Sequence, residues 1–274
     1  MDKKEFIFPL DEYITELKYQ EKALRTLIKY KADIKKFIAF IPDEPTNLQI
    51  TKDLTMQYKS LICNGKYKTK SINSYIIALN KYLKWLKLPG CTVKVLKTQS
   101  KNSLENVVTK ADYRRLLRYS QKLGYIDIYY IMRVFASTGI RFSELAFVTV
   151  ESLKETYITV NNKGKLRDIT VPRALCKELK QYCRDKNIKT GSIYTISPVK
   201  LWRRLQKIAG FARVSKNRAH AHNLRHMFAK EFMATFNNAI ELADILGHSS
   251  LETTRMYTRS SNDEKRKKIE RMNF

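Results

Sequence analysis

The apolar residues of the first ninety positions recur at helical spacing. Between residues 10 and 41 they fall three and four positions apart and stop at Pro42, which predicts two helices with a short break near Gln20. A second pair of helices is predicted at about 51–62 and 69–87, where the apolar stripe leaves the opposite face to lysines. Together the four segments predict a small all-helical bundle.

Beyond residue 107 the helical spacing returns and is interrupted once by the shorter period of strands. Between residues 156 and 171 two short apolar runs flank a turn at residues 161–165, which predicts a β-hairpin with lysines at its tip. The chain is therefore predicted to be mainly α, with an N-terminal helical bundle and an α-rich domain that holds a small antiparallel β-sheet. The helices expected in this second domain cover about 109–123, 128–137, 173–186 and 197–209.

Residues 90–107 separate these two parts and show no helical period. The stretch is rich in Lys, Thr, Ser and Asn, as is typical of an extended interdomain linker. A chain of 274 residues is long enough for two domains that each bury a core. We expect domains at 1–89 and 108–259, followed by a short charged tail at 260–274.

The charge of the chain points to a polyanionic partner. Its 53 Lys and Arg against 26 Asp and Glu give a net charge of +27, a self-repulsion that an anionic partner would offset, and nucleic acid is the leading candidate. No apolar run approaches the roughly 20 residues of a membrane span, and the N-terminus lacks the order of a signal peptide. The sequence predicts a cytosolic protein with no membrane partner, associated with the nucleoid when bound to DNA.

The basic residues are densest around the second helix pair. Between Leu54 and Leu104 the chain has ten lysines and no acidic residue. A solvated lysine face is the alternative, but such faces normally intersperse acids to limit repulsion. We interpret the lysines as phosphate contacts that position the protein on duplex DNA without reading its sequence. The candidates are Lys66, Lys68, Lys70, Lys81 and Lys84.

The cysteines and histidines do not predict a metal site. The four cysteines show neither CxxC pairing nor metal-ligand spacing, so they are interpreted as reduced thiols, with Cys176 and Cys183 on the core face of one helix. A zinc site at His220, His222 and His226 is the alternative, but no carboxylate or cysteine lies in that stretch. No metal and no cofactor are expected.

Two stretches of the second domain carry arginines in unusual settings. Arg141 follows the helix stop Thr138-Gly139 among apolar neighbours, so it is predicted to be semi-buried, and a semi-buried guanidinium requires an anion. His222 and Arg225 lie three residues apart, which places both on one face of a helix.

The stretch from Leu246 to Tyr257 holds an imidazole and a phenol at a fixed offset. His248 precedes Tyr257 by nine residues across a predicted helix start, where Gly247 breaks one helix and Ser249 with Glu252 forms a capping box for the next. A histidine at a helix end and a tyrosine that only packs would give the same pattern. The rest of the chain must decide between the two interpretations.

Taken in order, these residues resemble the catalytic set of the tyrosine recombinase family, the phage-integrase and Xer-like enzymes. The segment Thr-Gly-Ile-Arg-Phe-Ser-Glu-Leu at 138–145 is similar to the family's Thr-Gly-x-Arg-x-x-Glu-Leu box, and 246–257 is similar to its final box. The resemblance extends to 8–88, which looks like the helical core-binding domain, with no arm-binding domain expected before it. Carried over by position, the catalytic residues are Arg141, Lys163, His222, Arg225, His248 and Tyr257.

The hairpin departs from the family pattern. The family's box reads Gly-Lys-Gly followed by a further lysine and an arginine, but Asn162 replaces the first glycine and the spacing to Pro172 is off by one. The catalytic lysine is therefore Lys163 or Lys165. Lys163 is preferred because it directly leaves the first strand.

The resemblance implies a site-specific DNA recombinase or integrase that cleaves and rejoins DNA through a 3′-phosphotyrosine intermediate, without metal or nucleotide. It implies a homo-tetramer on two DNA sites, a monomer without DNA, and a terminal helix at 260–274 that docks on the neighbouring protomer, although a solvated tail is also open. Two alternatives use the same residues or scaffold: a non-catalytic DNA-binding protein and a type IB topoisomerase-like enzyme that relaxes DNA.

Overall fold

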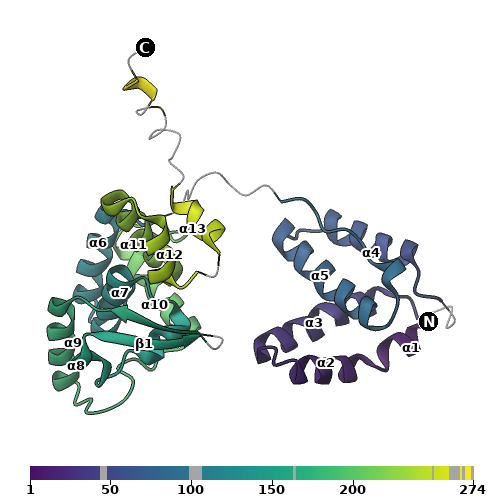
Figure 1. Ribbon diagram of the computed structural model, residues 1–274, viewed down its shortest axis with the longest axis horizontal. Coiled ribbons are helices and arrows are strands. Elements are labelled where there is room, and N and C mark those ends of the chain that lie inside the picture. The colour runs from purple at the N-terminus through teal and green to yellow at the C-terminus, as the bar shows by residue number, and fades with distance from the viewer. Residues whose placement is uncertain are drawn as a thin grey trace. The chain divides into compact units, whose positions relative to one another are not determined.

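The structure is a computed structural model that describes residues 1–43, 48–98, 107–162, 165–248, 250–258, 266 and 269–272. The chain divides into two compact units, Met1–Ser100 and Lys101–Phe274. Helices dominate both, and the described residues hold one two-stranded sheet (Figure 1). The predicted fold class, mainly α with a small antiparallel sheet in the second part, is confirmed.

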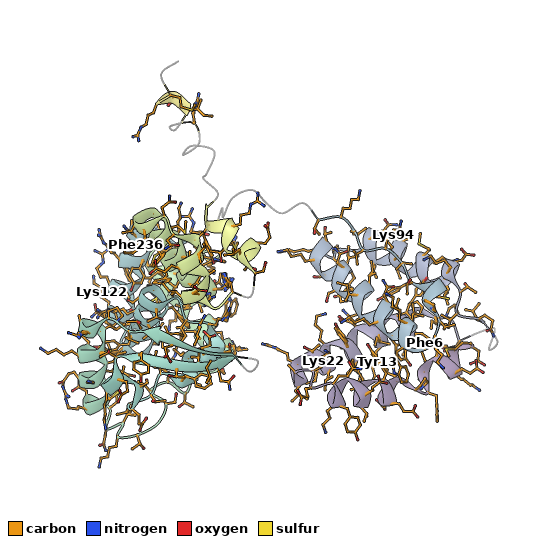
Figure 2. All side chains as sticks on the ribbon, in the orientation of Figure 1. Phe6, Tyr13, Lys22, Lys94, Lys122 and Phe236 are labelled. Carbon is orange, nitrogen blue, oxygen red and sulfur yellow. The ribbon has the colours of Figure 1, made fainter. Side chains whose placement is uncertain are left out.

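The N-terminal unit is a helical bundle built around aromatic residues. The prediction missed α1, because five residues are too few to show a helical period. Phe6 and Tyr13 point into the core (Figure 2), where the Tyr82 hydroxyl donates a hydrogen bond to the carbonyl oxygen of Phe6 at 2.6 Å. The elements are α1 (Lys3–Ile7), α2 (Leu10–Tyr19), α3 (Leu24–Phe40), α4 (Lys52–Asn64), α5 (Thr69–Trp85) and the 3₁₀ turn η1 (Pro89–Cys91).

The first part of the stretch predicted as a linker packs on this bundle. Val93 is buried, and the side chain of Asn80 exchanges two hydrogen bonds with its backbone, at 2.7 and 2.9 Å. Asn73 holds the backbone of Leu96 in the same way, at 2.9 and 2.8 Å. Beyond η1 the chain is therefore an extended segment fixed by two asparagines, and residues 99–106 of the predicted linker lie outside the described residues.

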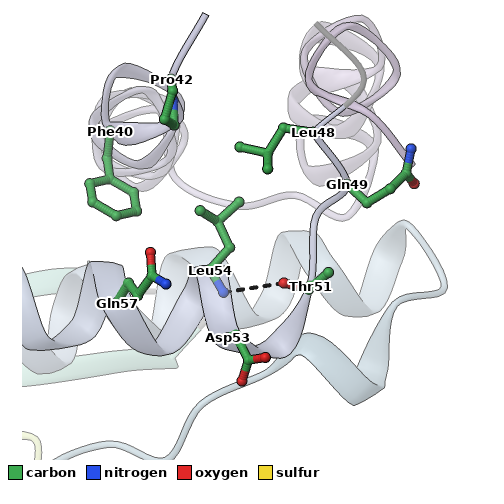
Figure 3. Close-up of a pocket in the computed structure, with 8 residues that line it drawn as sticks. All are labelled: Phe40, Pro42, Leu48, Gln49, Thr51, Asp53, Leu54 and Gln57. Carbon is green, nitrogen blue, oxygen red and sulfur yellow. Dashed lines mark hydrogen bonds between the residues drawn. The ribbon is translucent and has the colours of Figure 1, made fainter. Parts of the chain in front are cut away.

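A hollow lies between the end of α3 and the start of α4 (Figure 3). The Thr51 hydroxyl beside it caps α4 by accepting a hydrogen bond from the Leu54 N–H at 3.3 Å. Among the residues that line it, Asp53 is the one with a titratable side chain, which leaves little chemistry for a site. The lining consists of Phe40, Pro42, Leu48, Gln49, Thr51, Asp53, Leu54 and Gln57.

The second unit surrounds the buried helix α7 with helices and one hairpin. Strands β1 and β2 pair antiparallel from Tyr157↔Thr170 to Asn162↔Lys165. Cys176 and Cys183 are free and buried, as predicted. The elements are α6 (Lys110–Lys122), α7 (Ile126–Thr138), η2 (Phe142–Phe147), α8 (Ser152–Glu155), β1 (Tyr157–Asn162), β2 (Lys165–Thr170), α9 (Arg173–Asp185), α10 (Pro198–Phe211), α11 (Ala221–Phe236), α12 (Ala239–Leu246) and α13 (Leu251–Thr258).

The ends of these helices follow their local sequence. Thr109 and Asp112 form the predicted capping box of α6, and the Ser197 hydroxyl caps α10. The predicted cap at Ser249 falls outside the described residues. Within the part of the chain that is described, no helix is long and apolar enough to cross a membrane.

Candidate active site

A glycine turns the chain into the site at the end of α7. Gly139 has φ of 63°, a left-handed conformation that costs residues with a side chain more than glycine. A Cβ at this position would lie 2.6 Å from the ring of Phe228 and 2.8 Å from Leu246. Glycine is therefore required twice here, by backbone conformation and by close packing, and the turn delivers Arg141 two residues later.

Arg141 is held from two sides. Its backbone N–H and its Nη1 donate hydrogen bonds to the two carboxylate oxygens of Glu144, each at 2.8 Å, and its Nη2 donates to the carbonyl oxygen of Gly247 at 2.9 Å. The Arg141 side chain is 29 % exposed, so it is semi-buried as the sequence predicts. The guanidinium joins the end of α7 to the turn before α13.

Glu144 also forms an ion pair with Arg167, a residue that was not among the candidates predicted from the sequence. Nη2 of Arg167, on β2, donates to Glu144 at 2.7 Å, and the carboxylate is almost fully buried. Burial raises the pKa of Glu144, but hydrogen bonds from Arg141 and the charges of Arg167 and Arg141 outweigh it and hold the pKa below its usual range. Nε and Nη1 of Arg167 are buried and have no hydrogen-bond partner among the described residues.

Arg225, on α11, is the most deeply buried charge of the site, at 2 % exposure. Its guanidinium donates to the carbonyl oxygens of Gly139 and Leu246 and to Nε2 of His248. Burial, together with the charges of Arg141 and Arg167, lowers its pKa to about 10, so it stays protonated at neutral pH. Two guanidiniums thus share the carboxylate of Glu144 and the third is held by neutral acceptors, which leaves the site with a positive charge excess.

The contacts of His248 define its tautomer. Arginine can only donate, so Nε2 of His248 accepts from Nη2 of Arg225 at 3.1 Å. Nδ1 therefore carries the proton and donates it to the Thr254 hydroxyl at 2.8 Å. Burial, followed by the charges of the three arginines, lowers the pKa of His248 to about 4, in agreement with a neutral ring.

Tyr257 lies on α13 and is 7 % exposed. Its hydroxyl is 2.6 Å from Nδ1 of His226, and its ring is nearly parallel to that of His248 at a centroid distance of 6.5 Å. Burial raises the pKa of Tyr257 to about 12, and the charges of Arg225 and Arg141 oppose this shift. The phenol is therefore protonated in the absence of DNA.

His222 and His226 lie one turn apart on α11, with ring centroids 4.2 Å apart. His222 is exposed to solvent on one side, yet the protein that packs against its ring, followed by the charges of Arg225 and Arg141, lowers its pKa. His226 is 8 % exposed, and burial with the neighbouring His222, Arg225 and His248 lowers its pKa to about 4. The described residues contain no group of histidines, cysteines and carboxylates that could hold a metal ion.

The structure brings five of the six predicted residues to one place: Arg141, His222, Arg225, His248 and Tyr257 are linked by the contacts above. The sixth, Lys163, lies outside the described residues. Of its alternative, Lys165, only the backbone is described, where it pairs with Asn162 at the end of the hairpin. Sequence reasoning missed Arg167, although the arginine of the family's hairpin box was a signal for it, and it weighed His226 only as a metal ligand.

The sequence of the chain matches a known protein family over both of its units. The phage integrase family matches residues 106–264, and the phage integrase N-terminal SAM-like domain matches residues 10–90. The tyrosine recombinase XerA of Pyrococcus furiosus is 26 % identical over 278 residues, which cover 97 % of this chain and 94 % of that protein. The tyrosine recombinase XerC of Thermodesulfovibrio yellowstonii is 28 % identical over 280 residues, which cover 92 % and 91 %.

Solved structures share the fold. XerH site-specific recombinase bound to a palindromic difH substrate in a post-cleavage complex has a TM-score of 0.74 at 18 % identity, covering 96 % of this chain and 83 % of that one. A lambda integrase dimer bound to a COC′ core site has a TM-score of 0.73 at 18 % identity, covering 96 % of both chains. The family pattern matches more than half of the chain, and tyrosine recombinases are similar to nearly all of it. The chain therefore belongs to the phage integrase family and is a tyrosine recombinase, an enzyme of site-specific recombination.

Proposed function

We propose that Tyr257 of this recombinase cleaves duplex DNA at a specific site and forms a 3′-phosphotyrosine intermediate. The observation that carries the proposal is the charge of the site: Arg141 and Arg167 share the buried carboxylate of Glu144, and the buried guanidinium of Arg225 donates to backbone carbonyls and to His248, beside a buried phenol. A phosphodiester supplies two anionic non-bridging oxygens, which planar guanidiniums can bind with paired hydrogen bonds.

Each residue then has a chemical role. Arg141 and Arg225 hold the non-bridging oxygens of the phosphate and stabilise the charge that builds on them as the phenol attacks. His222, which is exposed to solvent on one side, is a hydrogen-bonding neighbour of the phosphate, and His248 orients the Arg225 guanidinium by accepting a hydrogen bond from it. The hairpin lysine, Lys163 or Lys165, is the general acid that protonates the 5′-oxygen leaving group.

Strand exchange follows from the reversibility of this step. The phosphotyrosine bond keeps the energy of the cleaved bond, so the 5′-hydroxyl of a partner duplex can attack it and restore the DNA backbone. We propose a homo-tetramer on two DNA sites, formed from monomers. The complexes of XerH with difH and of a lambda integrase dimer with a core site, together with the charge of +27 on this chain, support DNA as the partner of that assembly.

The exposed lysines of the N-terminal unit fit the same proposal. Lys66, Lys68, Lys70, Lys81 and Lys84 are all exposed, and Lys68 is the N-cap residue of α5. They contribute phosphate contacts that release counterions and position the unit on DNA without specifying its sequence.

The test is a suicide substrate whose nick lets the 5′ fragment diffuse away, built on a site selected from random DNA by the protein itself. A denaturation-resistant adduct is expected without magnesium for the wild type. Tyr257→Phe should abolish it while DNA affinity changes little, because one hydroxyl is a small term among many phosphate contacts. The matched control is Tyr194→Phe, which removes a buried hydroxyl of the same unit that has no hydrogen-bond partner among the described residues, and it should leave the adduct intact.

Other results would change the function. An adduct that survives in Tyr257→Phe would move the nucleophile elsewhere, and no adduct on the selected site would favour a non-catalytic DNA-binding protein. Relaxation of supercoiled DNA without exchange between two sites would favour a type IB topoisomerase-like activity.

A further inference from the structure

The hydroxyl of the proposed nucleophile is engaged by a histidine to which the preceding roles give no function. Oη of Tyr257 lies 2.6 Å from Nδ1 of His226, and the two ring centroids are 5.5 Å apart. Both side chains are buried, at 7 % and 8 % exposure, and they come from different helices, α13 and α11. This short contact is therefore a product of tertiary packing.

The direction of this hydrogen bond follows from burial and charge. A phenol has one donor, and leaving a buried donor unpaired costs more than leaving an oxygen lone pair unused. Burial, followed by the charges of His222 and Arg225, disfavours the charged form of His226 and lowers its pKa to about 4. At neutral pH Nδ1 therefore presents a lone pair, and the phenol donates its proton to it.

The other histidines of the site are less suited to accept the proton of the Tyr257 hydroxyl. Both ring nitrogens of His248 are engaged, Nε2 by Arg225 and Nδ1 by Thr254. His222 packs its ring against His226 one helical turn away, and it is exposed to solvent. Among the hydrogen bonds of the described residues, the one formed by the Tyr257 hydroxyl goes to His226.

We propose that His226 is a catalytic residue that takes the proton of Tyr257 during DNA cleavage. As Oη bonds to phosphorus and the bond from phosphorus to the 5′-oxygen breaks, the phenol proton moves to Nδ1 and makes an imidazolium. The 5′-oxygen takes its proton from the general acid. In rejoining, the 5′-hydroxyl attacks phosphorus and gives its proton back to the deprotonated general acid, while the bond to Oη breaks and the imidazolium returns its proton to the phenolate. The inference rests on the proposed function.

Transfer requires the substrate. The pKa of Tyr257 is about 12 and that of His226 about 4, so at neutral pH the shared proton belongs to the phenol. A phosphate bound by Arg141 and Arg225 adds negative charge beside the Arg225 guanidinium that now disfavours the imidazolium, which raises the pKa of His226. The growing bond to phosphorus makes the phenol more acidic at the same moment. Cleavage and proton transfer are therefore coupled.

The test compares single-turnover rates of adduct formation in variants of position 226. Oδ1 of an asparagine can replace Nδ1 as a hydrogen-bond acceptor but cannot keep the proton, so His226→Asn separates positioning from proton transfer. We expect His226→Asn and His226→Ala both to slow adduct formation by about 100-fold or more, the range of general acid–base catalysis. His220→Asn, at the N-cap of the same helix, is the matched control and should react at the wild-type rate.

A more acidic nucleophile provides the rescue. With 3,5-difluorotyrosine incorporated at position 257, the phenol needs less help to lose its proton, so the rate of His226→Asn should recover several-fold more than the wild-type rate changes. A wild-type rate in His226→Asn would overturn the proposal, and so would a slow His226→Asn that the fluorinated tyrosine does not rescue, because His226 would then only position the phenol.

Three further measurements distinguish a lost catalytic group from a lost fold. DNA affinity and thermal unfolding of the variants show whether they fold. Independently of any variant's fold, ¹H–¹⁵N NMR of the wild type should show an unprotonated Nδ1 at His226 at neutral pH, and a protonated Nδ1 would overturn the proposal. If the wild type forms no adduct at all, the proposed function fails. An adduct that needs Tyr257 but not His226 overturns only this inference.

Discussion

Nη1 of Arg167 lies against Gly247 so closely that a Cβ at Gly247 would clash with it and would lie 3.0 Å from Cδ and 3.1 Å from Cζ of the same side chain. Gly247 also ends α12 in the left-handed conformation, with φ of 61°, and its carbonyl oxygen accepts from Arg141. The strand β2, the end of α7 and the turn before α13 therefore meet at this glycine.

Gly247→Ala should impair DNA cleavage by displacing Arg167. Gly124 offers a matched control, because its φ is 72° and nothing lies within 4 Å of the Cβ that an alanine would add. Both substitutions should cost about 1–2 kcal/mol of folding free energy from the left-handed backbone. Only Gly247→Ala should also slow adduct formation, by about tenfold or more, because a misplaced guanidinium lowers transition-state stabilisation. Equal adduct rates after correction for the folded fraction would mean that the close approach has no catalytic consequence.

Glu144 should be the carboxylate on which the stability of the site depends. Glu144→Gln leaves Arg141, Arg167 and Arg225 without a buried counter-charge, so the free energy of unfolding should fall by about 3 kcal/mol. Glu178, which pairs with Arg133 and is 38 % exposed, is the control, and Glu178→Gln should cost about 1 kcal/mol or less. Denaturant unfolding of both variants measures the difference, and a similar loss in the two would show that the guanidiniums of the site do not need Glu144.

The histidines of the site should make the folding stability fall at pH values above those at which carboxylates titrate. The pKa of His226 and of His248 is about 4 in the folded protein against 6.5 for the ordinary side chain, and that of His222 is also lowered. The unfolded chain therefore binds more protons than the folded one between pH 6.5 and about 4, so stability falls as pH drops through this window and is level above it. The temperature of unfolding, measured from pH 7.5 to 5, should fall less in His226→Asn than in the wild type.

An identical pH profile in the wild type and in His226→Asn would show that His226 is not held neutral by the fold. The buried carboxylates do not contribute to the change in stability between pH 7.5 and 5. The pKa values of Glu144 and Asp112 are lowered, so their loss of stability begins only below the ordinary carboxyl pKa, near pH 4.

The lysines of the N-terminal unit should set the salt dependence of DNA binding. Changing Lys66, Lys68 and Lys70 to Gln should make the slope of log affinity against log salt shallower by up to about 0.9 for each phosphate that the variant no longer neutralises. The control triple, Lys4, Lys18 and Lys22 to Gln, removes the same charge from exposed positions outside the lysine-rich stretch and should leave the slope nearly unchanged. The slope measured between low and moderate salt decides the matter, and an equal effect of the two triples would assign the dependence to net charge alone.

Local sequence determines the long helices and their ends, and these were predictable. The Thr109 cap, the stop at Gly139 and the Ser197-Pro198 start each act within one helical turn, so their residues suffice to identify them. Short elements such as α1, α8 and η2 show no period long enough to detect.

The contacts of Arg167 and His226 are set by packing between segments distant in sequence. Arg167 reaches Glu144 across 23 residues, and His226 reaches Tyr257 across 31. Contacts over such distances produce no periodic pattern in the sequence. Helical spacing could therefore place His222 and Arg225 on one face of a helix, but it could not show which histidine contacts the phenol of Tyr257. The resemblance to recombinases identified five residues that the structure brings together, but it did not predict the contact between His226 and Tyr257.

The C-terminal tail should couple assembly to recombination. The side chains of Ile269 and Met272 are 63 % and 57 % exposed, and apolar side chains at helical spacing favour a partner surface. Truncation after Ser261 should leave DNA binding and the adduct on a single site nearly intact, while higher-order complexes and recombination between two sites weaken. The full-length double variant with Ile269→Gln and Met272→Gln tests the apolar contact without shortening the chain. Native gel mobility on two-site DNA distinguishes the outcomes: normal complexes and recombination in both variants would show that the tail is only solvated, whereas a defect in the truncation alone would assign assembly to other residues of the tail.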